Sequence, residues 1–280
     1  MSTVAIVTDS TADIPAEYKE KYDIHVVPLY VHIGKRSYKD QTELPPDTFF
    51  PMLKECVEMP STSQPAVGDF VKVYEELISQ GKKVLSIHLS SVLSGTFQSA
   101  SLAKLSAPAG QVEVIDSEAV TLSLGWQVIA AAEAAANGWE LEDIVDLVKE
   151  VRSQVKLYFA IDTLEYLYKG GRIGKVAAFL GSMLNFKPII TMENGGLVPH
   201  SRVRSQKQIF LKLVELAQAD LEKRGKIRLG VVHTAAPDKV QELRELLKVK
   251  LGLEELPPVA EAGAVLGTHV GPGALGISYY

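Results

Sequence analysis

The sequence of 280 residues contains a single cysteine, Cys56, and no apolar run of the length, about 18 residues, that a membrane-spanning helix needs. One cysteine cannot form a disulfide within the chain, which predicts a cytoplasmic location. No basic segment opens the chain and Asp9 interrupts its first apolar run, so no signal peptide is expected. Acidic neighbours disfavour a reactive thiolate at Cys56, and a structural role is predicted for it.

The sequence also lacks an excess of basic over acidic residues. The 29 Lys and Arg residues face 34 Asp and Glu residues, which gives a formal net charge of −5. This balance supplies no electrostatic reason to bind a nucleic-acid backbone, and no nucleic-acid partner is expected. Hydrophobic residues make up 46% of the chain and charged residues 22%, as in folded globular proteins. The length favours two domains.

Motifs for nucleotides and metals are absent or incomplete. Residues 271–276 match a dinucleotide fingerprint letter by letter, but only four residues follow, too few for the helix that this site requires. Residues 170–175 have the wrong spacing for a phosphate-binding loop. The sequence has no zinc or calcium motif. We therefore expect no metal, no cofactor and no use of ATP by this chain alone.

Strand and helix patterns alternate through the first half of the chain. Apolar runs at residues 4–7, 84–89 and 112–115 are each followed by a loop and a helical pattern. This repetition predicts a parallel sheet with right-handed crossovers, whose ligands bind at the carboxyl ends of the strands. The apolar segment 120–136 contains Gln127 and Glu133 and is interpreted as a buried helix.

The second half has a different pattern. Apolar runs on either side of residues 193–196 predict a hairpin, residues 205–223 an amphipathic helix, and residues 263–280 have strand-like character. We predict an α/β fold of two domains. An N-terminal parallel-sheet domain spans residues 1–153, a C-terminal α+β domain with a mixed sheet spans 154–280, and the ligand site lies between them.

Hydroxyl side chains follow the predicted strands. Residues 90–96 carry four of them and precede a helical pattern, so Ser94 is expected near a helix N-terminus, where free N–H groups favour an anion. Gly95 would allow close approach of that anion. Simple capping of the helix is an equal alternative. Residues 60–65 are held extended by two prolines and carry Thr62, although a plain polar loop also explains them.

Neutral donors at a helix N-terminus suit a carboxylate, and they also suit a phosphate. A serine hydrolase would need a base beside its nucleophile, and no Gly-x-Ser-x-Gly motif is present. Lone histidines are mostly structural, which is the expectation for His233. His269 is a better candidate for ligand contact, because glycines flank it on both sides.

Six segments in this order resemble the DegV family, the fatty-acid-binding proteins that serve as the lipid-carrying subunit of bacterial fatty acid kinase. The resemblance runs essentially end to end. It is carried by VTDSTAD at 7–13, TSQP at 62–65, SSVLSGT at 90–96, LYKGGRI at 167–173, KPI at 187–189 and GTHVGPG at 267–273.

The resemblance implies a long-chain fatty acid such as palmitate as ligand and a separate ATP-dependent kinase subunit as partner. It implies that Thr62 and Ser94 hydrogen-bond the carboxylate with Gly95 and His269 close by, and that the chain has no catalytic residue. Arg172 and Arg204 would lie near the head group or face the kinase. Two alternatives stay open: a hydrolase or transferase that uses Ser94, and a binder of a phosphorylated metabolite.

Overall fold

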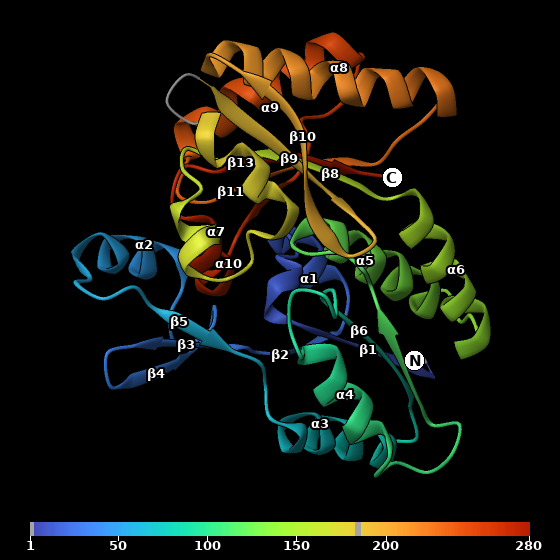
Figure 1. The fold of residues 1–280 in the computed structure, drawn as a ribbon. Coiled ribbons are helices and arrows are strands. Elements are labelled where there is room, and N and C mark those ends of the chain that lie inside the picture. The colour runs from blue at the N-terminus through green and yellow to red at the C-terminus, as the bar shows by residue number, and fades with distance from the viewer. Residues whose placement is uncertain (1–2, 183–185) are drawn as a thin grey trace.

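The computed structural model describes residues 3–182 and 186–280, which form two lobes stacked one above the other (Figure 1). The first lobe is built on four parallel strands in the order β2-β1-β6-β7. Their bounds are β1 Val4–Asp9, β2 Ile24–Val27, β6 Lys83–His88 and β7 Val112–Asp116. Every residue of β1 is buried, because helices cover both faces of the sheet. The predicted parallel sheet is confirmed, with β2 as an additional edge strand.

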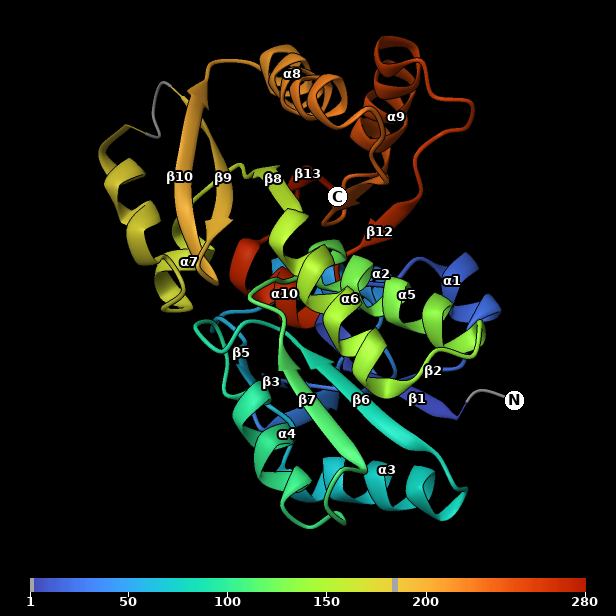
Figure 2. The ribbon, with the colours of Figure 1, turned by 90° about the vertical axis from the view of Figure 1, so that its right-hand side faces the viewer.

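Helices pack on both faces of this sheet, as Figure 2 shows. α3 and α4 contact one face, and α5 and α6 contact the other. α5 is buried along nearly its whole length because it also contacts the second lobe at β13, which confirms the predicted buried helix. The helices of this lobe are η1 Ser10–Ala12, α1 Ala16–Lys21, α2 Pro46–Glu55, α3 Val67–Ser79, α4 Thr96–Lys104, α5 Leu122–Ala136 and α6 Leu141–Gln154.

A small antiparallel sheet of three strands, β4-β3-β5, stands beside the first lobe. Its strands are β3 Tyr30–Ile33, β4 Arg36–Lys39 and β5 Ser61–Ser63. Sequence analysis did not predict this sheet, because strands of three or four mostly polar residues show little apolar alternation. The predicted extended segment at 60–65 is confirmed as β5, which places Thr62 opposite Val31.

The second lobe is a mixed sheet of six strands in the order β10-β9-β8-β13-β11-β12. Only the pair β11–β12 is parallel. The strands are β8 Lys156–Ala160, β9 Lys187–Glu193, β10 Gly196–Val203, β11 Leu229–His233, β12 Val259–Glu261 and β13 Leu275–Tyr279. β9 and β10 form the predicted hairpin, and its turn residues Asn194 and Gly195 have positive φ, as tight hairpin turns require. The mixed sheet is therefore confirmed.

Helices complete the second lobe. α8 and α9 cover the outer face of its sheet, and α7 and η2 lie beside the hairpin (Figure 1). The bounds are α7 Glu165–Lys169, η2 Gly174–Ser182, α8 Gln206–Arg224, α9 Pro237–Leu251 and α10 Ala264–Val270. No helix in the described ranges is long and apolar enough to cross a bilayer.

The prediction of strand character for all of residues 263–280 was wrong. Residues Ala264–Val270 form α10, and only Leu275–Tyr279 form a strand. α10 is a short, mostly buried helix, so its apolar residues are spread around it and show no helical stripe. Gly271, with a φ of 73°, ends the helix and turns the chain into the final strand.

The two sheets share one apolar core, and a cluster of polar contacts joins the lobes at its edge. Trp126 Nε1 donates to the carbonyl of Ser278 at 3.1 Å. Arg228 binds both oxygens of Glu133 at 2.8 Å and stacks over the ring of Trp126.

Among the described residues, no strand of the first sheet follows Asp116 and no strand of the second sheet precedes Lys156. We therefore propose to keep the domain boundary near residue 153.

We predict that Glu133→Gln lowers the free energy of unfolding by about 1–3 kcal/mol, because the half-buried guanidinium of Arg228 would lose its charged partner. Denaturant unfolding measures this change. Glu142→Gln is the matched control: its side chain is 76% exposed and its contact with Lys83 is 3.8 Å long, so its effect should stay below about 0.5 kcal/mol. Equal effects of the two substitutions would contradict the prediction.

A candidate ligand cavity between the lobes

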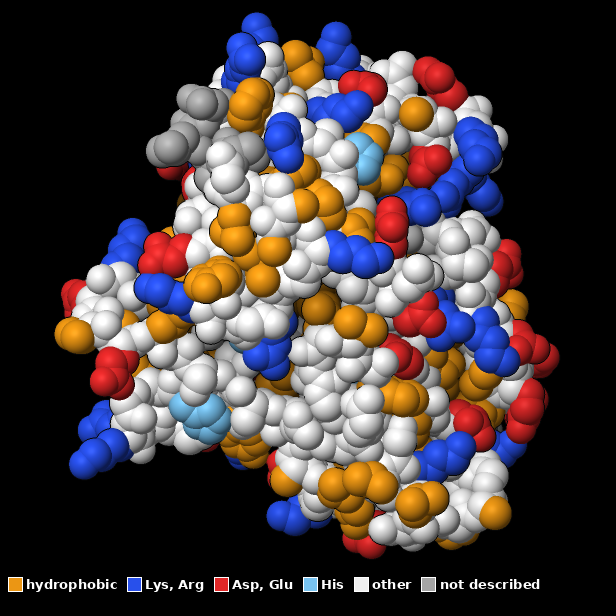
Figure 3. Space-filling view, in the orientation of Figure 1, with side chains coloured by type: hydrophobic (Ala, Val, Ile, Leu, Met, Phe, Trp, Pro, Cys, Tyr) orange, Lys and Arg blue, Asp and Glu red, His pale blue; other side chains and the backbone are white. Residues whose placement is uncertain are grey.

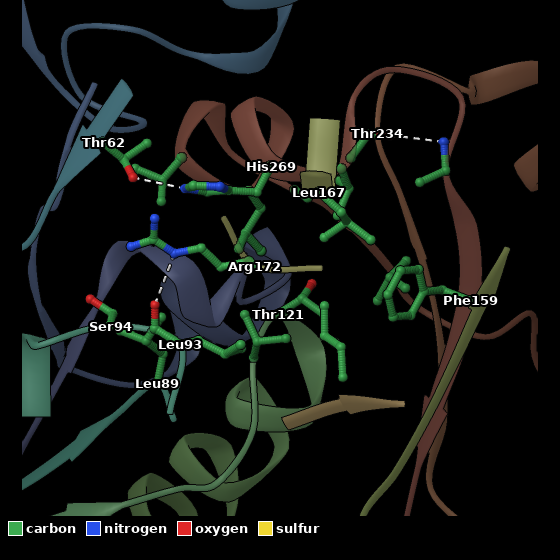
Figure 4. Close-up of a pocket in the computed structure, with 18 of the residues that line it drawn as sticks. Thr62, Leu89, Leu93, Ser94, Thr121, Phe159, Leu167, Arg172, Thr234 and His269 are labelled. Atoms are coloured by element: carbon green, nitrogen blue, oxygen red, sulfur yellow. Dashed lines mark hydrogen bonds between the residues drawn. The ribbon is translucent and has the colours of Figure 1, made fainter. Parts of the chain in front are cut away.

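A cavity lies where the two lobes meet, and it encloses about 970 Å³ of space free of protein atoms, including the part that opens to solvent. Most of the lining is apolar, as Figure 4 shows for Leu89, Leu93, Phe159 and Leu167. The other apolar lining residues are Leu29, Val120, Leu157, Leu197, Val232, Ala262, Val265, Leu266, Val270, Ala274 and Leu275.

A hydroxyl and an imidazole from different lobes meet at one end of the cavity. Thr62 Oγ1 on β5 lies 2.8 Å from His269 Nε2 on α10 (Figure 4). The second ring nitrogen, Nδ1, is buried without a hydrogen bond from the described part of the chain. Burial, and to a smaller extent the charge of Arg172, lowers the pKa of His269 to about 4. His269 is therefore a neutral ring at pH 7.

Arg172 brings a positive charge to the same end. Its Nε donates to the carbonyl of Leu93 at 3.2 Å, and its Nη1 donates to the carbonyl of Gly170 at 2.7 Å. These bonds fix the plane of the guanidinium, and its other N–H groups have no hydrogen-bond partner within residues 3–182 and 186–280. Among the described residues no carboxylate forms an ion pair with Arg172. A half-buried cation without a counter-ion, beside a neutral imidazole, favours an anionic ligand.

Ser94 also lines the cavity, although its hydroxyl has a local role. Ser94 Oγ accepts the N–H of Thr96, the first residue of α4, at 3.3 Å and lies 2.9 Å from Thr96 Oγ1. Ser94 therefore satisfies one backbone N–H of the first turn of α4, although the N-cap position itself is Gly95 and has no side-chain cap. A Cβ on Gly95 would lie 2.5 Å from Gln64 Oε1, so the group that approaches this glycine closely is the amide of Gln64. Gln64 lines the cavity and was not predicted.

Thr234 and His233 are among the other polar residues that line the cavity, and both already form hydrogen bonds with backbone groups. Thr234 donates to the carbonyl of Gly271 at 2.7 Å and accepts the N–H of Ala274 at 2.9 Å. His233 Nδ1 accepts the N–H of Ala236 at 3.3 Å, and burial lowers the pKa of His233 to about 4. The structural role predicted for His233 agrees with this contact.

A Ser–His–Asp chain does exist in the molecule, but it is sealed inside the first lobe. His88 Nε2 lies 2.6 Å from Ser86 Oγ, and His88 Nδ1 lies 3.0 Å from Asp9 Oδ2. Tyr74 donates to Ser86 at 2.8 Å, and the side chains of Ser86, His88 and Asp9 have no exposed surface. Asp9 also caps η1 through the N–H of Thr11. With no access for a substrate, this chain satisfies buried polar groups.

The structure brings Thr62, Ser94, His269 and Arg172 to one cavity. Gly95 lies beside Ser94 without lining the cavity, and its contact with a ligand stays a prediction. Arg204 lies elsewhere: its guanidinium stacks on the ring of Phe186 at 5.1 Å, and it does not line the cavity. The head-group role that the resemblance allowed for Arg204 is therefore not supported. Its other predicted role, a contact with the kinase partner, stays a prediction.

Comparison with known proteins agrees with this architecture. A family model described as "uncharacterised protein, DegV family" matches residues 3–280. Protein DegV of Bacillus subtilis is 39% identical over 277 residues, covering 99% of this chain and 98% of that protein. The fold and the cavity define a two-lobed α/β protein with a mostly apolar cavity at the lobe junction. The chain belongs to the DegV family, as its six motifs predicted.

Solved structures of the family superpose closely on this chain. A DegV family protein from Thermus thermophilus, described by its fatty acid binding, gives a TM-score of 0.93 at 38% identity and covers 100% of this chain and 99% of its own. DegV of Bacillus subtilis, described as a fatty acid binding protein, gives 0.90 at 37% identity with the same coverage. A stearic-acid-binding protein from Eubacterium ventriosum gives 0.90 at 26% identity, covering 99% and 97%.

We predict that His269 titrates with a midpoint near 4, because its ring is buried beside Arg172. A histidine in an unfolded chain titrates near about 6.5, so the unfolded state takes up this proton first as the pH falls. Stability is therefore lost as the pH falls from about 6.5 to about 4. Two-dimensional NMR of the imidazole resonances measures the midpoint, and a value above about 6 would contradict the prediction.

Proposed function

We propose that this chain binds a long-chain fatty acid, with the carboxylate at Arg172, Thr62, His269 and Ser94 and the hydrocarbon tail in the apolar part of the cavity. The observation that carries the proposal is the guanidinium of Arg172, which has no counter-ion among the described residues and lies at the polar end of a mostly apolar cavity. A ligand with one negative charge and a long apolar body matches both halves of this site.

The relatives support the ligand class. The proteins from Thermus thermophilus and Bacillus subtilis, both described as binding fatty acids, share more than a third of their residues with this chain over its full length. The Eubacterium ventriosum protein is described as binding stearic acid. A saturated ligand such as palmitate or stearate is therefore the first one to test.

Affinity and orientation come from different parts of such a ligand. Burial of a methylene contributes about 0.8 kcal/mol, so a tail of about 14 methylenes contributes on the order of 10 kcal/mol as an upper bound. Hydrogen bonds from a charged guanidinium contribute about 1.5–3 kcal/mol. The tail thus supplies most of the binding free energy, while Arg172 and the Thr62–His269 pair decide which end of the ligand faces solvent.

The two alternative functions have less support. An enzyme that uses Ser94 as a nucleophile needs a base, yet the hydrogen bonds of Ser94 Oγ within the described chain go to Thr96. His269, the other candidate base at the site, is bonded to Thr62 instead. A phosphorylated metabolite would leave the apolar lining without a partner. It would also meet a single cationic side chain, Arg172, among the lining residues that the structure describes. We therefore propose a binding protein that is not itself an enzyme.

We further propose that the bound carboxylate is presented to a separate ATP-dependent fatty acid kinase subunit. The chain has no phosphate-binding loop of its own. Basic side chains lie over much of the second lobe on the face shown in Figure 3. Arg202 and Arg204 rest on the rings of Phe179 and Phe186 and form no ion pair with a described carboxylate, so they are available to an acidic partner surface. A cytoplasmic location stays a prediction.

We predict that protein purified under native conditions carries a fatty acid, detected by native mass spectrometry. For delipidated protein, Arg172→Gln should weaken palmitate binding by about 10- to 150-fold, because the carboxylate loses its one cationic partner. Isothermal titration calorimetry measures both affinities. Wild-type protein that copurifies with no lipid and shows no affinity for palmitate or stearate would remove the basis of the proposal.

Lys175→Gln is the matched control for Arg172→Gln. Lys175 is an exposed cation three residues further along the chain and does not line the cavity. Its loss should leave the affinity for palmitate unchanged within about twofold, since exposed charges are screened. A similar loss of affinity in both variants would indicate a general charge effect and would count against a specific role for Arg172.

We predict that Arg204→Glu leaves palmitate binding unchanged but lowers acyl phosphate formation by an added kinase subunit by about tenfold, through charge repulsion at the docking surface. An ATP-consumption assay with palmitate-loaded protein measures the rate. Lys223→Glu is the control, because Lys223 is exposed at the far end of α8, about 27 Å along the helix. Equal rates for Arg204→Glu and wild type would exclude Arg204 from the interface.

A further inference from the structure

Two carboxylates of the first lobe hold the start of α10, a helix of the second lobe. Asp13 follows η1 and Asp40 follows β4, and their exposed fractions are 4% and 1%. Asp13 Oδ1 accepts the N–H of Gly263 at 3.1 Å, and Asp40 Oδ1 accepts the N–H of Val265 at 3.2 Å. Both side chains therefore cap the same end of α10.

The backbone around this contact is crowded and strained. A Cβ on Gly263 would lie 2.7 Å from Asp40 Oδ1, so glycine is required for Asp40 to close on this segment. Gln41 Nε2 donates to Asp13 Oδ1 at 3.0 Å. Asp13, Gln41 and Thr121 all have positive φ, of 42°, 61° and 50°. Strained residues persist where their surroundings hold them and gather at functional sites.

Each of the two carboxylates has one oxygen without a partner. The Oδ2 atoms of Asp13 and Asp40 are buried and accept no hydrogen bond from residues 3–182 or 186–280, and Thr121 Oγ1 is also buried without a hydrogen bond there. A buried ionised oxygen without a donor is costly, whereas a protonated oxygen carries no charge and can itself donate.

The charges around the pair do not compensate two anions. Lys19 on α1 is the cation that acts on Asp13, but it is exposed and bonds Gln41 Oε1 at 3.2 Å, so solvent screens it. The other facing groups are backbone N–H groups from Gln41 and from Gly263 to Val265, and the hydroxyls of Ser10 and Thr121. Glu261, two residues before Gly263, lies 3.8 Å from His233.

Burial is the main cause that raises the pKa of both carboxyls. It raises the pKa of Asp40 to about 6. It raises the pKa of Asp13 well above its usual value, and the nearby charge of Asp40 raises it further. Both carboxyls therefore hold a proton more strongly than an exposed carboxyl does, and the pair resists carrying two negative charges.

The pair is coupled to the ligand cavity through α10 and Thr121. Thr121, Val265 and His269 all line the cavity, and His269 makes the contact with Thr62. A shift at the start of α10 would move Val265 and His269 together, because both belong to one short helix.

We propose that Asp13 and Asp40 are positioning residues that together hold one proton near neutral pH, and that this proton keeps α10 docked in its ligand-binding position. The ligand part rests on the fatty-acid binding proposed above. Loss of the proton puts two charges in a space without a buried cation, and α10 loosens. Because the folded pair binds protons more tightly than the unfolded chain, its contribution to stability is present below about pH 4 and is lost as the pH rises through the folded pKa values.

Hydrogen–deuterium exchange of α10 in ligand-free protein tests the positioning role. Between pH 6.5 and 9, protection of the α10 amides, corrected for the intrinsic exchange rate, should fall by about fivefold or more in the wild type. In Asp13→Asn it should stay level, because the amide can still accept from Gly263 and has an N–H in place of the acid proton. Asp146→Asn removes a carboxylate that is 78% exposed and should behave like wild type.

Palmitate affinity over the same pH range tests the functional consequence. The affinity of the wild type, divided by that of Asp13→Asn, should fall by about fivefold or more. The carboxyl of palmitate titrates alike with both proteins, so this ratio isolates the pair. Protein that binds no palmitate but shows the expected exchange pattern would overturn the proposed ligand and leave the positioning role in place.

Level protection of α10 in the wild type from pH 6.5 to 9 would overturn the proposal. Protection that depends on added Mg²⁺ or K⁺ at constant pH would also overturn it, since a cation and not a proton would then lie between the carboxylates. If Asp13→Asn does not fold, carbon-13 NMR of the aspartate carboxyls in the wild type decides: titration of Asp13 above about pH 7 supports the proposal, and titration below about pH 5 overturns it.

Discussion

α10 belongs to the second lobe, but it packs against α2, β3 and β5 of the first. Its start is held by Asp13 and Asp40, and its end places His269 2.8 Å from Thr62. The cavity lies where α10 docks on the first lobe, and residues of both lobes line it. Without the docked helix the two sheets would still exist, because their strands pair independently, but the polar end of the site would lose its imidazole and one side of its wall.

Charged groups with a structural role have partners in this protein, whereas the charged group of the proposed ligand site has no counter-ion among the described residues. Arg228 is neutralised by Glu133 and covered by aromatic rings. The buried hydrogen-bond chain that runs from the side chain of Tyr74 to that of Asp9 gives each of its polar groups a partner inside the first lobe. Arg172 is bonded to two carbonyls and has no described carboxylate beside it. Since an unpaired half-buried charge is costly, a site that keeps one is best explained by a ligand that completes it.

Local patterns predicted the elements that are long and regular. The strands β1 and β6 and the helix α5 are buried and mostly apolar, and tertiary contacts reinforce these local patterns. The small sheet was missed because its strands are short and polar, and β5 depends on pairing with Tyr30–Ile33, about thirty residues away. α10 was assigned to a strand because glycines and a buried environment hide the helical period in Ala264–Val270.

The sequence by itself determined the fold class, the family and the residue types of the polar end, because these depend on runs and motifs of adjacent residues. Only the tertiary structure decided that Arg172 lines the cavity while Arg204 lies elsewhere, that Gln64 fills the space at Gly95, and that Asp13 meets Asp40 at Gly263. The physical reason is the same in each case. Burial, charge compensation and hydrogen-bond partners are set by groups that are far apart along the chain, and the packing of the two lobes brings them together.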